Sequence, residues 1–174
     1  MNATRSLPWV LCLGLVTFSV AVFGGLPAEL PTKISAAGVI VRTVPKSLFH
    51  WFLLPGVAVL TQALLTGIAL ALPRNPALFN FAEKEEFLKL PREYQVPVVE
   101  QMQIALDLIS VLVMLAMCFV QWMLWRTALG HPQPMASVIL IVGAVMTAPV
   151  ALLMLTRVSR AFEEQQKRWR AARR

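Results

Sequence analysis

Four long apolar runs constrain this chain more than any other feature of its sequence. They cover residues 8–24, 48–72, 98–125 and 135–156, and each is long enough to cross the hydrocarbon core of a bilayer as a helix. Apolar residues make up 57% of the chain, against about 45–50% in soluble domains. We therefore predict an all-α membrane protein, a bundle of four transmembrane helices with short outer loops, one cytoplasmic surface loop and a basic C-terminal helix.

The first run raises the alternative of a cleaved signal peptide. It follows Arg5 and ends at Gly24-Gly25-Leu26-Pro27. The run is long for a signal peptide, and no clear Ala-x-Ala triplet follows it. We favour a helix that is retained.

The distribution of Lys and Arg predicts the orientation. One basic residue precedes the first run, four lie in the 73–103 loop and seven in the tail, against three and one in the two outer loops. Cytoplasmic loops carry the excess of basic residues. We expect both termini in the cytoplasm of a bacterial inner membrane, with residues 1–156 as the transmembrane domain and 157–174 as a basic tail.

Asp107 is the residue of the apolar runs whose ionised form would be expensive in the membrane. Burying its carboxylate near a helix centre costs about 2.5–3.5 kcal/mol, so it needs a partner or a proton. Spacings of three or four residues place Glu100, Gln103, Asp107 and Ser110 on one helix face. With Gln62 of the second run, this polar stripe could line a ligand or proton path. The simpler interpretation places Asp107 near the headgroups, hydrogen-bonded to a neighbouring helix, because no Lys or Arg lies within the runs.

The tail concentrates the net charge of +7. Anionic lipid headgroups are the partner expected for its basic residues, which are Arg157, Arg160, Lys167, Arg168 and Arg170. No fold or motif supports nucleic-acid binding.

Motifs that carry catalysis or bind metals are missing from the sequence. It contains no nucleophile elbow, phosphate loop or zinc-ligand spacing. His50 and His131 are both expected at the outer interface, but two histidines alone make a poor metal site. Cys12 and Cys118 lie in apolar runs, where thiols behave as small apolar groups. We predict no enzyme activity, no metal and no cofactor.

The first outer loop has a distinctive frame. Pro27 and Pro31 stiffen the exit from the first helix, Gly38 permits a turn, and Lys46 lies at the start of the second helix as an interface anchor. With Leu26 and Ala36, these residues resemble a bacterial membrane domain of unknown function that also begins the SdpI-type immunity proteins. The resemblance covers about residues 8–72 and implies a helix–loop–helix unit in a bacterial inner membrane.

The loop departs from that family at its polar positions. The family has histidine, asparagine, aspartate and an aromatic residue where this chain has Lys33, Ser35, Val41 and Thr43. Functions that depend on those side chains do not follow from the resemblance.

The sequence leaves three functions open. The first is a non-enzymatic immunity, sensing or accessory subunit that acts through contacts with another membrane protein or a second copy. The alternative is a small transporter or channel component that uses Asp107 and the polar stripe. The third is a protein that stays in the membrane only to hold its basic cytoplasmic tail.

Overall fold

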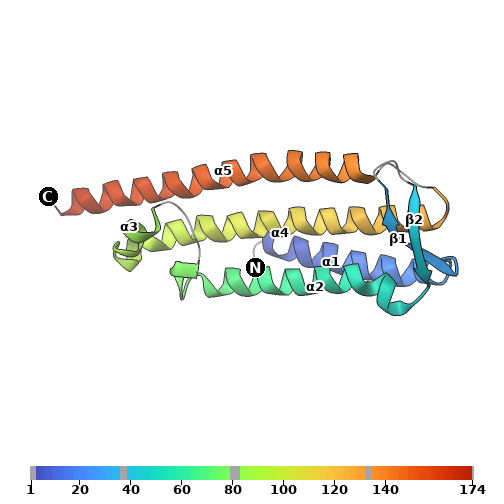
Figure 1. Ribbon diagram of the computed structural model, residues 1–174. Helices are drawn as coiled ribbons and strands as arrows, with labels where there is room; N and C mark the ends of the chain where they lie inside the picture. The colour runs from blue at the N-terminus through green and yellow to red at the C-terminus, as the bar shows by residue number, and fades with distance from the viewer. Residues whose placement is uncertain (1–2, 36–38, 79–82, 132–134, 174) are drawn as a thin grey trace.

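The computed structural model describes residues 3–35, 39–78, 83–131 and 135–173, and consists mainly of long helices that lie side by side (Figure 1). In chain order the elements are α1 (Ala3–Phe23), β1 (Glu29–Ile34), β2 (Ile40–Pro45), α2 (Leu48–Ala71), the 3₁₀ turn η1 (Pro76–Leu78), α3 (Lys84–Leu88), α4 (Arg92–Ala128) and α5 (Met135–Ala172). The two strands and the C-terminus lie at opposite ends of the molecule. We call these the hairpin end and the tail end.

Within the part of the chain that the structure describes, three helices are long and apolar enough to cross a membrane, namely Arg5–Phe23, Leu48–Ala71 and Arg92–Ala128. α4 packs against α1, α2 and α5, so it is the central helix of the bundle. The exposed faces of α1 and α2 are apolar, as lipid-facing surfaces require; examples are Leu13, Leu60 and Leu64. This agrees with the expected multi-pass membrane protein.

The first outer loop is a β-hairpin, so the chain is mostly helical but not all-α as predicted. β1 and β2 pair antiparallel, with Glu29 opposite Pro45 and a register irregularity beyond Pro31. The signal was present in the β-branched run Val39-Ile40-Val41-Arg42-Thr43-Val44. A two-stranded sheet is marginal alone, and this one is anchored because Leu30 is buried with Leu26 and Trp51 of α2.

α4 and α5 extend well beyond the apolar runs that predicted them. α4 begins at Arg92 rather than after Pro97, since proline in the early turns of a helix removes few hydrogen bonds. α5 runs without a break from Met135 to Ala172, so the expected C-terminal helix directly continues the helix of the fourth apolar run. With a rise of 1.5 Å per residue, each of these two helices is about 55 Å long.

The extra length forms a packed projection at the tail end, where α4 and α5 extend beyond α1 and α2 (Figure 1). We call residues 92–103 and 157–172 the stalk. Its apolar core joins side chains from α2, α3, the turn between α3 and α4, α4 and α5. The core members with at most 2% of their surface exposed are Leu72, Phe87, Val98, Met102, Val158 and Phe162.

The sequence of the 73–103 loop predicts a short helix that lies on the surface, with Phe81, Phe87 and Leu88 on its apolar face. α3 has one turn and a half and buries Phe87 completely in the stalk core, while Leu88 is exposed. Phe81, the third member of the expected apolar face, lies outside the described residues. The loop therefore covers the base of the stalk with its main aromatic side chain turned inward.

Candidate functional site

The predicted polar stripe on α4 changes its surroundings along the helix. Glu100 is exposed, Gln103 is partly buried, and Asp107 and Ser110 are buried. This face of α4 is therefore exposed at Glu100 and is covered by neighbouring helices at Asp107. Ser110 has 4% of its surface exposed.

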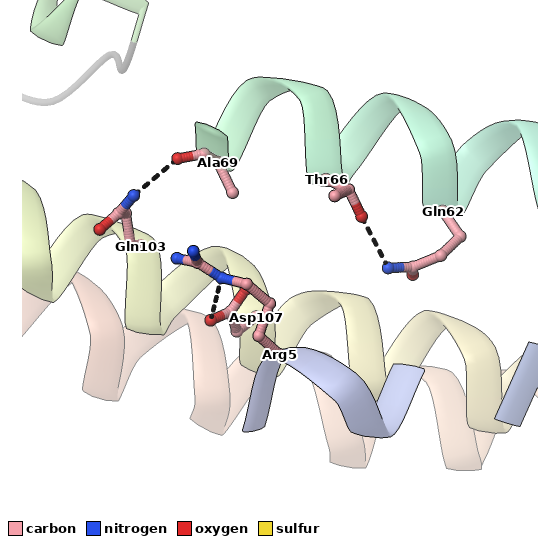
Figure 2. Close-up of polar contacts among 6 residues, drawn as sticks. All are labelled: Arg5, Gln62, Thr66, Ala69, Gln103 and Asp107. Atoms are coloured by element: carbon pink, nitrogen blue, oxygen red, sulfur yellow. Dashed lines mark hydrogen bonds and ion pairs between the residues drawn. The ribbon is translucent and has the colours of Figure 1, made fainter. Parts of the chain in front are cut away.

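Asp107 is paired with Arg5, which the sequence had not suggested as its partner (Figure 2). The Arg5 Nε atom lies 3.6 Å from Asp107 Oδ2, and the side chains are 33% and 12% exposed. That separation is too long for a strong hydrogen bond, so the contact is an ion pair at a partly wet site. The first basic residue of α1 thus neutralises the buried carboxylate of α4.

The direction of the helices explains why Arg5 meets Asp107. α1 and α4 run in the same direction, because Arg5 meets Asp107 while Phe18 meets Trp125 edge to face near the hairpin end. Arg5 precedes the first apolar run and Asp107 lies early in the third. In parallel helices these two positions have similar depth, but the sequence alone did not show that α1 neighbours α4.

Two amide side chains form hydrogen bonds with groups of α2, one from α4 and one from α2 itself. Gln103 Nε2 donates a 2.7 Å hydrogen bond to the backbone oxygen of Ala69, one of the last carbonyls of α2 (Figure 2). Helix ends leave such carbonyls without intrahelical partners. Gln62 is 2% exposed and donates to Thr66 Oγ1 at 3.1 Å, whereas its Oε1 has no hydrogen-bond partner in the described structure.

An apolar layer follows these polar groups toward the hairpin end. Cys12 and Leu15 of α1, Ala58 of α2 and Met114 of α4 are buried together. Among the described side chains of α1, α2 and α4, this layer interrupts the polar stripe between Ser110 and the next buried amide, Gln121. Water and ions would have to cross an apolar contact to pass along it.

Gln121 is fully buried beyond the apolar layer, and neither of its amide atoms has a partner among the described residues. It borders a cavity of about 40 Å³ with Thr32 and His50. A water molecule needs about 10–15 Å³ of such volume, so the cavity can hold water but is too small for most metabolites.

The residues of the outer-loop motif hold the hairpin to the bundle. Lys46 Nζ donates to the backbone oxygens of Gly24 at 3.3 Å and Leu26 at 3.0 Å, and lies 4.8 Å from the centre of the Phe23 ring. A cation at the C-terminal end of a helix is favourable because free carbonyls gather there. Lys46 therefore caps α1, a more specific role than the expected interface anchor.

The motif's other members are less informative. Pro31 is buried in β1 and Pro27 is exposed, while Gly38 lies outside the described residues.

Of the two histidines expected at the outer interface, His50 contacts the start of α2. His50 Nδ1 lies 2.8 Å from Ser47 Oγ at the start of α2, and Ser47 Oγ also caps that helix by accepting from the His50 backbone N–H. Across the described part of the chain, no group of three His, Cys, Asp or Glu side chains is placed to hold a metal ion.

The basic residues of the tail lie on the exposed face of α5. Arg157, Arg160, Lys167, Arg168 and Arg170 are all exposed. Arg168 pairs with Glu164 at 2.6 Å, and Arg173 stacks over Trp169 at 4.2 Å. The opposite face of the same segment packs into the stalk core, so α5 is held beside α4 and does not lie apart from it.

A cavity that the sequence did not suggest opens beside the stalk. It has a volume of about 420 Å³ and lies between the segment after α2 and the first turns of α4. Its polar lining includes Arg74, Arg92, Glu100 and Gln103. Two predicted members of the polar stripe, Glu100 and Gln103, thus belong to this cavity, and Asp107 does not line it.

Comparisons with protein families, curated proteins and solved structures found no match. The resemblance of the outer loop to the family of the SdpI-type immunity proteins therefore stays a prediction.

Proposed function

We propose that this chain is a four-span membrane protein with both ends in the cytoplasm, acting as a non-enzymatic immunity, sensing or accessory subunit. The partner is a second membrane protein, bound through the stalk. The single observation that carries the proposal is the stalk itself, a packed two-helix projection with a charged outer face.

The bilayer position follows from the aromatic residues at the hairpin end. Trp51 and Trp125 lie in the core beneath the hairpin, and tryptophan favours the membrane interface. About 20 residues cross the hydrocarbon, which brings α2 to its end at Ala71 and α4 to about Leu106. The Arg5–Asp107 pair then lies at the inner boundary, where an ion pair is much less costly than at the midplane.

α5 supplies the fourth span in this arrangement. Its residues 135–156 are apolar, and its continuation packs beside α4 through Val158 and Phe162. The segment from Arg157 to Ala172 would rise about 20 Å from the membrane. Arg157 and Arg160 stay close to anionic headgroups, while Lys167, Arg168 and Arg170 are carried into the cytoplasm.

A stalk built in this way suits recognition of a protein. A tail that lay flat on the membrane would have to separate from α4 and α3, and would give up the packed core around Val158 and Phe162. The buried polar groups favour the accessory role over the transporter alternative, because Asp107 is neutralised by Arg5 and the apolar layer interrupts the stripe. No described feature supplies a continuous path.

Site-specific photocrosslinking tests the proposal in intact cells. A crosslinking amino acid at Lys167 should capture one partner in stoichiometric yield, and the same amino acid at Arg42 of the hairpin is the matched control. Labelling of Arg170→Cys and Arg42→Cys with a membrane-impermeant thiol reagent, after replacement of Cys12 and Cys118, should place the two positions on opposite sides. Labelling of both positions from the same side of the membrane would overturn the four-span topology. Recovery of the Lys167 variant as a lone chain would overturn the accessory role.

A further inference from the structure

We propose that the cavity between α2 and α4 binds the headgroup of a phospholipid carrying both a phosphate and a primary ammonium group. This inference rests on the membrane position given above, and it is independent of the partner protein. At about 420 Å³ the cavity is within the size range of small-ligand sites.

The cavity brings together three charged side chains without protein partners. Arg74 follows the end of α2, Arg92 begins α4, and Glu100 lies two turns further along α4. All three side chains are exposed, and none forms a hydrogen bond or ion pair within the described residues. Two guanidinium groups and one carboxylate are therefore available to a ligand.

The floor and walls of the cavity are held by hydrogen bonds. Gln103 lines the cavity and ties α4 to the last turn of α2 through the Ala69 carbonyl oxygen. Gln95 Nε2 donates to the Leu90 oxygen at 2.8 Å, which fixes the turn from α3 into α4. Val96 and Val99 supply apolar wall between these polar groups. The site is thus a shaped recess, and its charges are not simply scattered over a surface.

The position of the cavity points to the bilayer as the source of the ligand. α2 ends at Ala71, so Arg74 lies at the level of the headgroups once α2 spans the membrane, while Arg92 at the start of α4 lines the recess from its cytoplasmic side. Basic recesses between helices at this level bind lipid headgroups. Arginine suits phosphate because its planar fork donates two parallel hydrogen bonds.

The carboxylate of Glu100 determines which class of phospholipid headgroup fits the cavity. A carboxylate beside the phosphate would repel a purely anionic headgroup, whereas a primary ammonium can donate hydrogen bonds to it. A quaternary ammonium has no N–H to donate. Two arginines for the phosphate and one glutamate for the ammonium match phosphatidylethanolamine better than phosphatidylglycerol or phosphatidylcholine.

Lipid binding is measured on the full chain purified in mild detergent, by native mass spectrometry with each of the three lipids. Phosphatidylethanolamine should bind about tenfold more tightly than the other two, the factor expected for one charge-assisted hydrogen bond. Arg74→Gln with Arg92→Gln should weaken its binding at least about tenfold, and Glu100→Gln should remove the preference over phosphatidylcholine. Arg170→Gln, outside the cavity, is the control and should change neither.

Equal binding of the three lipids, or an unchanged affinity in the double arginine variant, would overturn the proposal. Soluble glycerophosphoethanolamine separates the sources, because binding as tight as that of the lipid would exclude the bilayer as the source. Circular dichroism and the melting temperature without added lipid confirm that each variant is folded. A chain that is selective for the lipid but recovers no crosslinked partner would overturn only the accessory role.

Discussion

Different interactions hold the two ends of the molecule against the helix bundle. At the tail end, α4 and α5 continue past the other helices and bury a sizeable apolar core that includes Phe87, Met102 and Phe162. At the hairpin end, a two-stranded sheet rests on a smaller apolar cluster and is tied down by a few directed contacts to helix ends. The tail end thus depends on burial and the hairpin end on hydrogen-bond geometry.

Directed contacts dominate the hairpin end because short strands bury little surface. Lys46 donates to two carbonyl oxygens near the end of α1, and Trp51 Nε1 donates to the Ser19 oxygen at 2.9 Å. Both donors belong to the segment at the start of α2, whereas Ser19 lies in α1 and Gly24 and Leu26 lie in the turn that follows it. Each bond therefore fixes the hairpin's two flanking helices relative to one another.

Removing an aromatic side chain from the stalk core should give the largest effect. Phe87→Ala leaves a cavity in a fully buried site, so we expect a loss of about 3–5 kcal/mol in the free energy of unfolding. Unfolding in mixed detergent micelles, followed by circular dichroism, measures it. Leu88→Ala, at an exposed neighbouring position, should cost about 0.5 kcal/mol or less. Similar losses in the two variants would show that the stalk is not a packed unit.

The ion pair should have an intermediate effect. In a double-mutant cycle with Arg5→Met and Asp107→Leu, we expect a coupling free energy of about 1–2 kcal/mol, because the pair is only partly buried. Asp107→Asn should leave membrane insertion and partner capture intact. If that variant abolished a proton- or ion-dependent activity, Asp107 would act in transport and the apolar layer would have to open.

The cap on α1 should give the smallest change in stability of the three. Lys46→Met removes two hydrogen bonds from a partly exposed ammonium group, which we expect to cost about 1 kcal/mol. Because those bonds position the hairpin, protease cleavage within residues 29–45 should rise while the stalk stays protected. Lys33→Met is the matched control on β1, with an exposed side chain that should leave both readouts unchanged. Equal protease sensitivity of wild type and Lys46→Met would remove the capping role.

The sequence by itself determined the helical membrane character of the chain. Length and hydropathy are sufficient for that, since any apolar segment of about 20 residues satisfies its backbone in lipid most simply as a helix. It also determined that Asp107 needed compensation and that Glu100, Gln103, Asp107 and Ser110 share a face, because helical periodicity is local. The hairpin was missed although Val39 to Val44 favoured a strand, because the segment was interpreted only as a stiffened exit from the first helix at Pro27 and Pro31.

Only the tertiary structure decided which residue compensates Asp107, where α4 and α5 end, and what the polar stripe faces. These outcomes depend on which helices are neighbours and in which direction they run, and no local pattern encodes that choice. Arg5 reaches Asp107 because α1 is parallel to α4, and the tail becomes a stalk because Phe162 meets Phe87 from α3. The cavity with Arg74, Arg92 and Glu100 arises for the same reason, from segments that meet only in the folded chain.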